Sequence, residues 1–218
     1  MTVITQEDLI QSFQDALQYI SYYHPPDFIR GVANAYEREE SPAACDAMAQ
    51  ILINSRMCAE GHRPICQDTG IVNVFVSVGM NVRFESDLSL EDMINEGVRR
   101  AYNLPENVLR ASVLSDPAGK RANTKDNTPA VIHTEIVPGD KVEVHVAAKG
   151  GGSEAKAKFV MLNPSDSIVD WVIKTVPTMG AGWCPPGMLG IGIGGTAEKA
   201  MLLAKRSLMD PIDIQDLQ

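Results

Sequence analysis

Residues 72–78 read VNVFVSV, and this alternation decides the fold class. Its four valines share one face of an extended chain, because successive side chains of a strand point to opposite faces. Apolar residues at three- and four-residue steps predict helices elsewhere: one between Thr5 and the Pro25-Pro26 pair, then others at about 41–61, 89–101, 165–176 and 196–207. The strand is therefore expected to lie in a domain that is also rich in helices.

Two further β segments are predicted. Residues 130–148 read as a hairpin with its turn at 138–140, and residues 159–162 read as another strand. No internal repeat or low-complexity linker divides the chain. We therefore expect one α+β domain over residues 1–218, with a mixed, largely antiparallel sheet flanked by helices.

Composition excludes several classes of protein. The chain has 218 residues, 44% of them hydrophobic, which is typical of a globular protein and not of a disordered one. A formal net charge of -9 disfavours binding to nucleic acid, and the chain has no apolar run long enough for a membrane span. Its four cysteines are widely spaced, which favours free or metal-binding thiols in the cytoplasm over a disulfide framework.

Cys66 and Cys184 each lie in a short segment that predicts a turn. Residues 66–70 read CQDTG, and residues 184–186 read CPP. Thiolates held in such turns are typical ligands of iron–sulfur clusters and other soft metal sites. Two unrelated buried thiols are the alternative. Cys45 and Cys58 fall within a predicted helix, where packing explains them better.

Two glycine-rich segments and one arginine are further candidates. Lys149 precedes three glycines whose amides could bind a carboxylate or phosphate, although a flexible surface loop is the alternative. Residues 190–195 match the spacing of a dinucleotide-binding loop, but the two prolines at 185–186 interrupt the strand that this fold requires. Arg110 begins an apparent strand and could hold a carboxylate, or it could form a surface ion pair.

Taken in order, CQDTG at 66–70, AKGGGS at 148–153 and CPP at 184–186 resemble the class I iron–sulfur fumarate hydratases and the related tartrate dehydratases. The similarity runs from about residue 48 to the end of the chain. It implies a [4Fe–4S] cluster with one iron open to substrate, and it makes Cys66 and Cys184 two of the cluster's three cysteine ligands. No cysteine follows Cys184, so the resemblance implies an N-terminal, alpha-type region of a longer enzyme.

The resemblance also implies a function and partners. The expected reaction is reversible hydration of fumarate to (S)-malate, with tartrate dehydration as a close alternative and a non-catalytic assembly or dimerisation domain as a different one. Asp68 would transfer a proton or orient the hydroxyl group, and Gln67 would hydrogen-bond the substrate. The substrate carboxylates would be bound by Arg110, Lys149, Gly150 and Gly151. Expected partners are a small dicarboxylate, a C-terminal or beta region, and a second copy in a homodimer.

Overall fold

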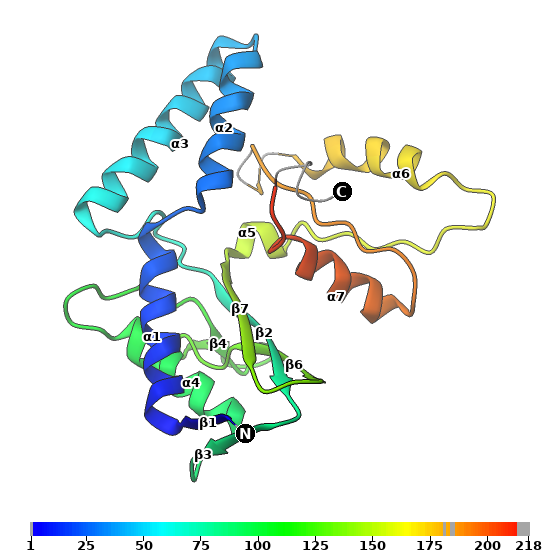
Figure 1. Ribbon diagram of the computed structural model, residues 1–218. Helices are drawn as coiled ribbons and strands as arrows, with labels where there is room; N and C mark the ends of the chain where they lie inside the picture. Colours follow the sequence, from blue (N-terminus) through cyan, green and yellow to red (C-terminus); the bar gives the residue numbers. More distant parts are fainter. Residues whose placement is uncertain (1, 181, 184–185, 213–218) are drawn as a thin grey trace. The chain divides into compact units, whose positions relative to one another are not determined.

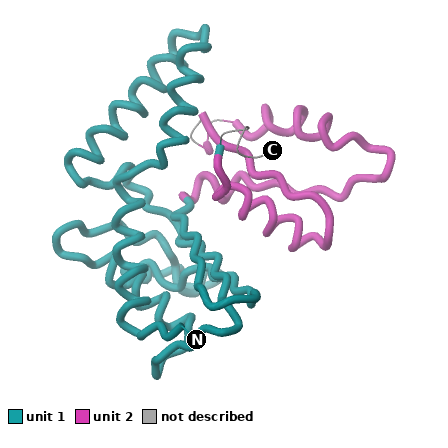
Figure 2. The backbone as a smooth tube through the Cα atoms, viewed as in Figure 1, with its two compact units in different colours: residues 1–149, 212–218 teal, residues 150–211 magenta. Residues whose placement is uncertain are grey.

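The computed structural model describes residues 2–180, 182–183 and 186–212. The chain divides into two compact units (Figure 2). Unit 1 comprises Met1–Lys149 with Ile212–Gln218, and unit 2 comprises Gly150–Pro211. The elements of unit 1 are β1 (Thr2–Thr5), α1 (Gln6–Tyr22), α2 (Pro26–Arg38), α3 (Pro42–Gly61), β2 (Ile71–Gly79), β3 (Val82–Glu85), α4 (Leu90–Tyr102), β4 (Leu114–Ser115), β5 (Ala122–Asn123), β6 (Val131–Val137) and β7 (Val142–Lys149).

The helix predictions for unit 1 are confirmed, and two of these helices begin with a capping side chain. Thr5 Oγ1 accepts a hydrogen bond from Asp8 N at the start of α1, and Ser89 Oγ accepts one from Asp92 N at the start of α4. Helix α3 begins at Pro42. Helix α2 was not predicted, because the proline pair that ends α1 also supplies Pro26 as the first residue of a new helix.

Strand β2 lies in the centre of a three-stranded sheet, parallel to β6 and antiparallel to β7 (Figure 1). The predicted hairpin at 130–148 is therefore wrong in its pairing: both strands exist, but β2 separates them. The connection between them crosses the end of β2, where Gly79 N donates to Lys141 O at 2.8 Å and Asn81 N donates to Gly139 O at 2.9 Å. A central position satisfies the backbone groups on both edges of the valine-rich strand.

The α+β prediction is confirmed, and the sheets are mixed. β1 pairs with β3 in parallel and β4 pairs with β5 antiparallel, in addition to the three-stranded sheet. The strand predicted at 159–162 is wrong, since these residues have no regular structure. No helix among the described residues is long and apolar enough to cross a membrane.

The hydrophobic core of unit 1 lies between β2 and the helices α1 and α4. Val72 and Val74 are fully buried, as the alternation predicted. Helix α1 contributes Phe13 and Leu17, and α4 contributes a continuous buried side formed by Met93, Ile94, Val98, Ala101 and Tyr102. This core fixes the start of β2 and the last turn of α4 in one rigid structure.

Unit 2 consists of short helices joined by long connections. Its elements are α5 (Gly151–Glu154), α6 (Ile168–Thr175), the 3-10 helix η1 (Val176–Met179) and α7 (Ala197–Ser207). The predictions of helices at 165–176 and 196–207 are confirmed, although α6 begins later than expected. None of the described side chains of unit 2 is fully buried, so the core of the described chain lies in unit 1.

Candidate functional site

Residues 66–70 form an irregular turn that leads directly into β2, and we call it the 66–70 turn. The Cys66 thiol is exposed, with its Sγ 3.8 Å from Gln67 Oε1. Asp68 is half-buried, and its Oδ1 accepts hydrogen bonds from Gly70 N at 3.2 Å and from Ser112 Oγ at 3.3 Å. The carboxylate therefore shapes the turn and also connects it to a distant segment of unit 1.

The structure brings Arg110 to the same place. Thr69 Oγ1 donates a hydrogen bond to the backbone oxygen of Arg110, although 41 residues separate them in sequence. The Arg110 side chain is exposed. The prediction that Arg110 begins a strand is wrong, because residues 109–113 are irregular and β4 starts only at Leu114. Gln67, Asp68 and Arg110 thus belong to two segments that are hydrogen-bonded to each other.

Lys149 lies beside the start of β2, where its backbone is paired with Ile71. Gly70 has a φ of +77°, and a Cβ placed there would come within 2.6 Å of the Lys149 carbonyl carbon. The close approach requires glycine for two independent reasons, its positive φ and the lack of space. The 66–70 turn, the segment 110–113 and Lys149 therefore meet at one end of β2.

Gly150 and Gly151 begin unit 2. Gly150 caps α5, and its carbonyl oxygen accepts a hydrogen bond from Glu154 N at 3.1 Å. The three glycines therefore form the start of a short helix and not a flexible loop. A Cβ on Gly152 would meet Gly182 O at 2.5 Å, so the backbone of unit 2 also approaches itself closely here.

The two predicted cysteine ligands differ in what the structure describes. Cys184 lies outside the described residues. Cys66 fits a metal ligand, because it is an exposed free thiol on irregular backbone next to polar side chains. Within the described ranges, no three His, Cys, Asp or Glu side chains are grouped so that they could hold a metal ion.

Sequence reasoning missed two buried residues that support the turn. Tyr102, at the end of α4, is 1% exposed and donates its hydroxyl to Thr69 O at 2.9 Å. Asn127 is fully buried and donates Nδ2 to Gly70 O at 2.8 Å. In the sequence, Tyr102 only continues an apolar helical stripe, and Asn127 lies in a polar segment. Neither pattern indicates a contact with residues 66–70.

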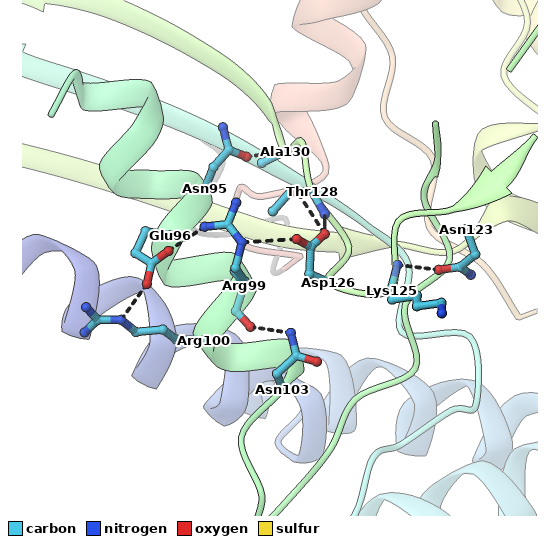
Figure 3. A network of polar contacts seen from close by, with 10 residues as sticks. All are labelled: Asn95, Glu96, Arg99, Arg100, Asn103, Asn123, Lys125, Asp126, Thr128 and Ala130. Atoms are coloured by element: carbon cyan, nitrogen blue, oxygen red, sulfur yellow. Dashed lines mark hydrogen bonds and ion pairs between the residues drawn. The ribbon is translucent and has the colours of Figure 1, made fainter. Parts of the chain in front are cut away.

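The loop that carries Asn127 is attached to α4 (Figure 3). Asp126 Oδ2 accepts from Arg99 Nε at 3.1 Å, and Asp126 Oδ1 accepts from Thr128 N at 3.0 Å. Burial acts to raise the pKa of Asp126, but the hydrogen bonds from Thr128 and Arg99 outweigh it and hold that pKa below its ordinary value. Asn95 Oδ1 accepts from Ala130 N at 2.8 Å, so both ends of this short loop are attached to one helix.

Tyr102 gives a prediction for alkaline pH. Burial raises the pKa of Tyr102 to about 12, against 10.0 for an ordinary tyrosine. Between pH 10 and 12 the unfolded chain therefore loses the Tyr102 hydroxyl proton, while the folded chain keeps it. The contribution of the neutral Tyr102 hydroxyl to the free energy of unfolding is fully present below pH 10 and is lost as the pH rises towards 12. Between pH 9 and 11, wild type should lose about 1–2 kcal/mol more unfolding free energy than Tyr102→Phe.

Urea unfolding at several pH values measures this difference. Tyr19→Phe is the matched control, because Tyr19 is 58% exposed. The control should follow the wild-type pH dependence. Parallel curves for wild type and Tyr102→Phe would contradict the assignment of a neutral, buried hydroxyl to Tyr102.

A hollow on the surface of unit 1 lies away from this site. It has a volume of about 440 Å³ and lies along α4, and the side chains of Gln6, Asp92, Asn95, Glu96 and Arg99 contribute to its wall. None of the predicted site residues lines it. The candidate site is therefore defined by the backbone segments that meet at the end of β2.

Comparison with known proteins gives a consistent result. A family model described as fumarate hydratase (Fumerase) matches residues 10–218. A protein described as "Putative L(+)-tartrate dehydratase subunit alpha" from Methanocaldococcus jannaschii is 32% identical over 210 residues, which cover 94% of this chain and 72% of that protein. L(+)-tartrate dehydratase subunit alpha from Escherichia coli is 27% identical over 196 residues, which cover 88% of this chain and 64% of that protein.

Proposed function

The chain belongs to the fumarate hydratase (Fumerase) family, and from that membership we propose that it is the alpha-type part of a hydro-lyase that acts on a small dicarboxylate. The observation that carries the proposal is the position of Cys66. Its exposed thiol directly precedes Gln67 and Asp68, and Arg110 and Lys149 lie at the same end of β2. A soft metal ligand, a carboxylate and two cationic residues are thus carried by backbone segments that meet at one end of β2.

The proposed cofactor is a [4Fe–4S] cluster held by Cys66 and Cys184, with a third cysteine ligand that does not correspond to any residue of this chain. When bound, the cluster supplies a Lewis-acidic iron for a hydroxyl group that would otherwise be a poor leaving group. The side chains of this chain would bind and orient the substrate and transfer protons. Elimination removes a proton from one carbon and the hydroxyl from its neighbour, which forms the double bond and releases water.

Each site residue has a proposed part in this reaction. Asp68 would move a proton at the hydroxyl group or orient that group, and Gln67 would hydrogen-bond the substrate. Arg110 and Lys149, with the backbone of Gly150 and Gly151, would bind the two carboxylates, since planar guanidinium groups and backbone amides suit carboxylate oxygens. The cations would also offset the negative charge of a substrate approaching a protein with a net charge of -9.

Two substrates are candidates. The family description supports fumarate, and the names of the relatives, tartrate dehydratase subunit alpha, support tartrate. Those names also support a separate beta-type subunit as partner. The test is an anaerobic assay of the complete enzyme with its proposed beta-type subunit, in which hydration of fumarate and dehydration of L(+)-tartrate are measured side by side. Turnover of neither substrate would reject the proposed function.

Asp68→Asn tests the role of the carboxylate. Asparagine keeps an oxygen that can accept from Gly70 N and Ser112 Oγ, so the turn should persist and the melting temperature should change little. Proton transfer should be lost, which lowers kcat by about 10²- to 10⁴-fold. The exposed Asp140→Asn is the control and should keep wild-type kcat. Full activity of Asp68→Asn would favour a non-catalytic assembly domain.

A further inference from the structure

We propose that Asn127 is a positioning residue, which clamps the 66–70 turn to the segment 110–113 and so holds the two halves of the site in unit 1 at a fixed separation. The clamp itself rests on the geometry of unit 1. Its importance for turnover rests on the proposed function.

Asn127 uses both ends of its amide across long sequence distances. Nδ2 donates to Gly70 O at 2.8 Å, on the turn that carries Gln67 and Asp68. Oδ1 accepts from Ser112 N at 2.8 Å and from Val113 N at 3.2 Å, on the segment that carries Arg110. One fully buried side chain therefore hydrogen-bonds backbone groups of two separate segments, and it is the acceptor for both Ser112 N and Val113 N.

Asparagine suits this position for two reasons. Its φ is +60°, a left-handed conformation that asparagine tolerates better than most residues because of its short polar side chain. Its amide also combines a donor and an acceptor, whereas an aspartate could accept from Ser112 and Val113 but could not donate to Gly70 O. The position therefore requires a residue with both hydrogen-bonding functions.

The clamp is anchored to a rigid helix. Asp126, which precedes Asn127, forms an ion pair with Arg99 of α4 (Figure 3). Thr128, which follows Asn127, donates its backbone N–H to Asp126 and is thereby connected to the same helix. Tyr102 of the same helix donates to Thr69 O. Helix α4 has its buried side in the core, so a movement of the turn relative to segment 110–113 would have to break contacts with the core.

The clamp acts on groups that are proposed to meet the substrate. Ser112 Oγ donates to Asp68 Oδ1 at 3.3 Å, so Ser112, together with Gly70 N, helps to position the carboxylate. Thr69 Oγ1 holds the Arg110 backbone. A displacement of reacting groups by about 1 Å can lower a rate by about 100-fold. Loss of the clamp is therefore expected to affect turnover more than folding.

Asn127→Gly is the test variant, because glycine accepts the positive φ and lacks the amide side chain. In the complete enzyme, hydrogen exchange by mass spectrometry should show amides of peptides covering 110–114 exchanging at least about tenfold faster, since Ser112 N and Val113 N lose their acceptor. kcat/KM should fall by about 10- to 100-fold. Asn127→Asp keeps the acceptor but loses the donor, so it should retain slow exchange at 110–114 and still lose kcat/KM.

Val98→Ala is the control for a purely structural effect. Val98 is fully buried on α4, so its truncation destabilises the same core without touching the clamp, and kcat/KM per folded molecule should stay at the wild-type value. Unchanged exchange at 110–114 in Asn127→Gly would show that there is no clamp. Faster exchange with the same kcat/KM as Val98→Ala would show a clamp that does not position the site.

If the proposed hydro-lyase function is wrong, the experiments give a result that differs from the loss of the clamp. Wild-type enzyme without turnover of fumarate or tartrate would reject the function and the positioning role with it. The exchange measurement would still decide, on the same protein, whether Asn127 holds the two segments together.

Discussion

Gly70→Ala is expected to destabilise unit 1 by about 3–5 kcal/mol, a large part of the stability of a typical domain. A φ of +77° costs alanine about 1–2 kcal/mol. The new methyl group would also lie 2.6–2.8 Å from backbone atoms of Lys149 and Ala148, which cannot rotate away. β7 would have to separate from the start of β2, where the Ile71–Lys149 and Val72–Ala148 pairs form.

Urea unfolding followed by circular dichroism measures this effect as a lower transition midpoint. Gly139→Ala is the matched control in unit 1, because Gly139 also has a positive φ, +115°, but no atom lies within 4 Å of the added methyl group. The control should show only the conformational cost, about 1–2 kcal/mol. Equal destabilisation of the two variants would contradict the close packing of β7 against Gly70.

Cys66→Ser is expected to abolish the proposed [4Fe–4S] cluster and the proposed turnover while leaving the fold intact. A serine hydroxyl is a poor ligand for soft iron compared with a thiolate. Changes in the outer shell of a metal site cost about 10- to 100-fold in affinity or activity, so loss of a direct ligand should cost at least about 100-fold. The fold should persist, because the Cys66 side chain is exposed and its Sγ contacts Gln67 Oε1 only weakly, at 3.8 Å.

The measurement is the visible absorption of the complete enzyme, reconstituted anaerobically with iron and sulfide, together with its activity. Cys45→Ser is the control, since Cys45 is half-buried on α3 and its Sγ donates to Glu39 O. The control should retain both absorption and activity. A wild-type spectrum in Cys66→Ser would remove Cys66 from the ligand set, even if turnover were impaired.

The elements that could be predicted from sequence are those with local signals. Helices α1 and α4 each have an apolar stripe and a capping side chain immediately before their first residue, and β2 has a strict alternation of valines. These signals depend on residues only a few positions apart, so they can be recognised without knowing how the rest of the chain folds. The strand expected at 159–162 had no such alternation and does not form.

Strand pairing was less predictable. Alternation in β6 and β7 showed which residues share a face, but it carries no information about which strand is the neighbour. A turn-like segment at 138–140 favoured a hairpin, whereas the structure inserts β2 between the two strands. The reason is the larger gain from covering both edges of the most apolar strand, a gain that depends on residues about 60 positions away.

By itself the amino-acid sequence determined the fold class, the main helices, the central strand and the short motif that carries Cys66, Gln67 and Asp68. Only the tertiary structure decided that Arg110 lies against Thr69 and that Tyr102 and Asn127 hold the turn from within the core. Motifs are visible in sequence because their residues are adjacent. The supporting residues are not, because a buried hydrogen bond between positions 127 and 70 exists only after the chain has closed the loop between them.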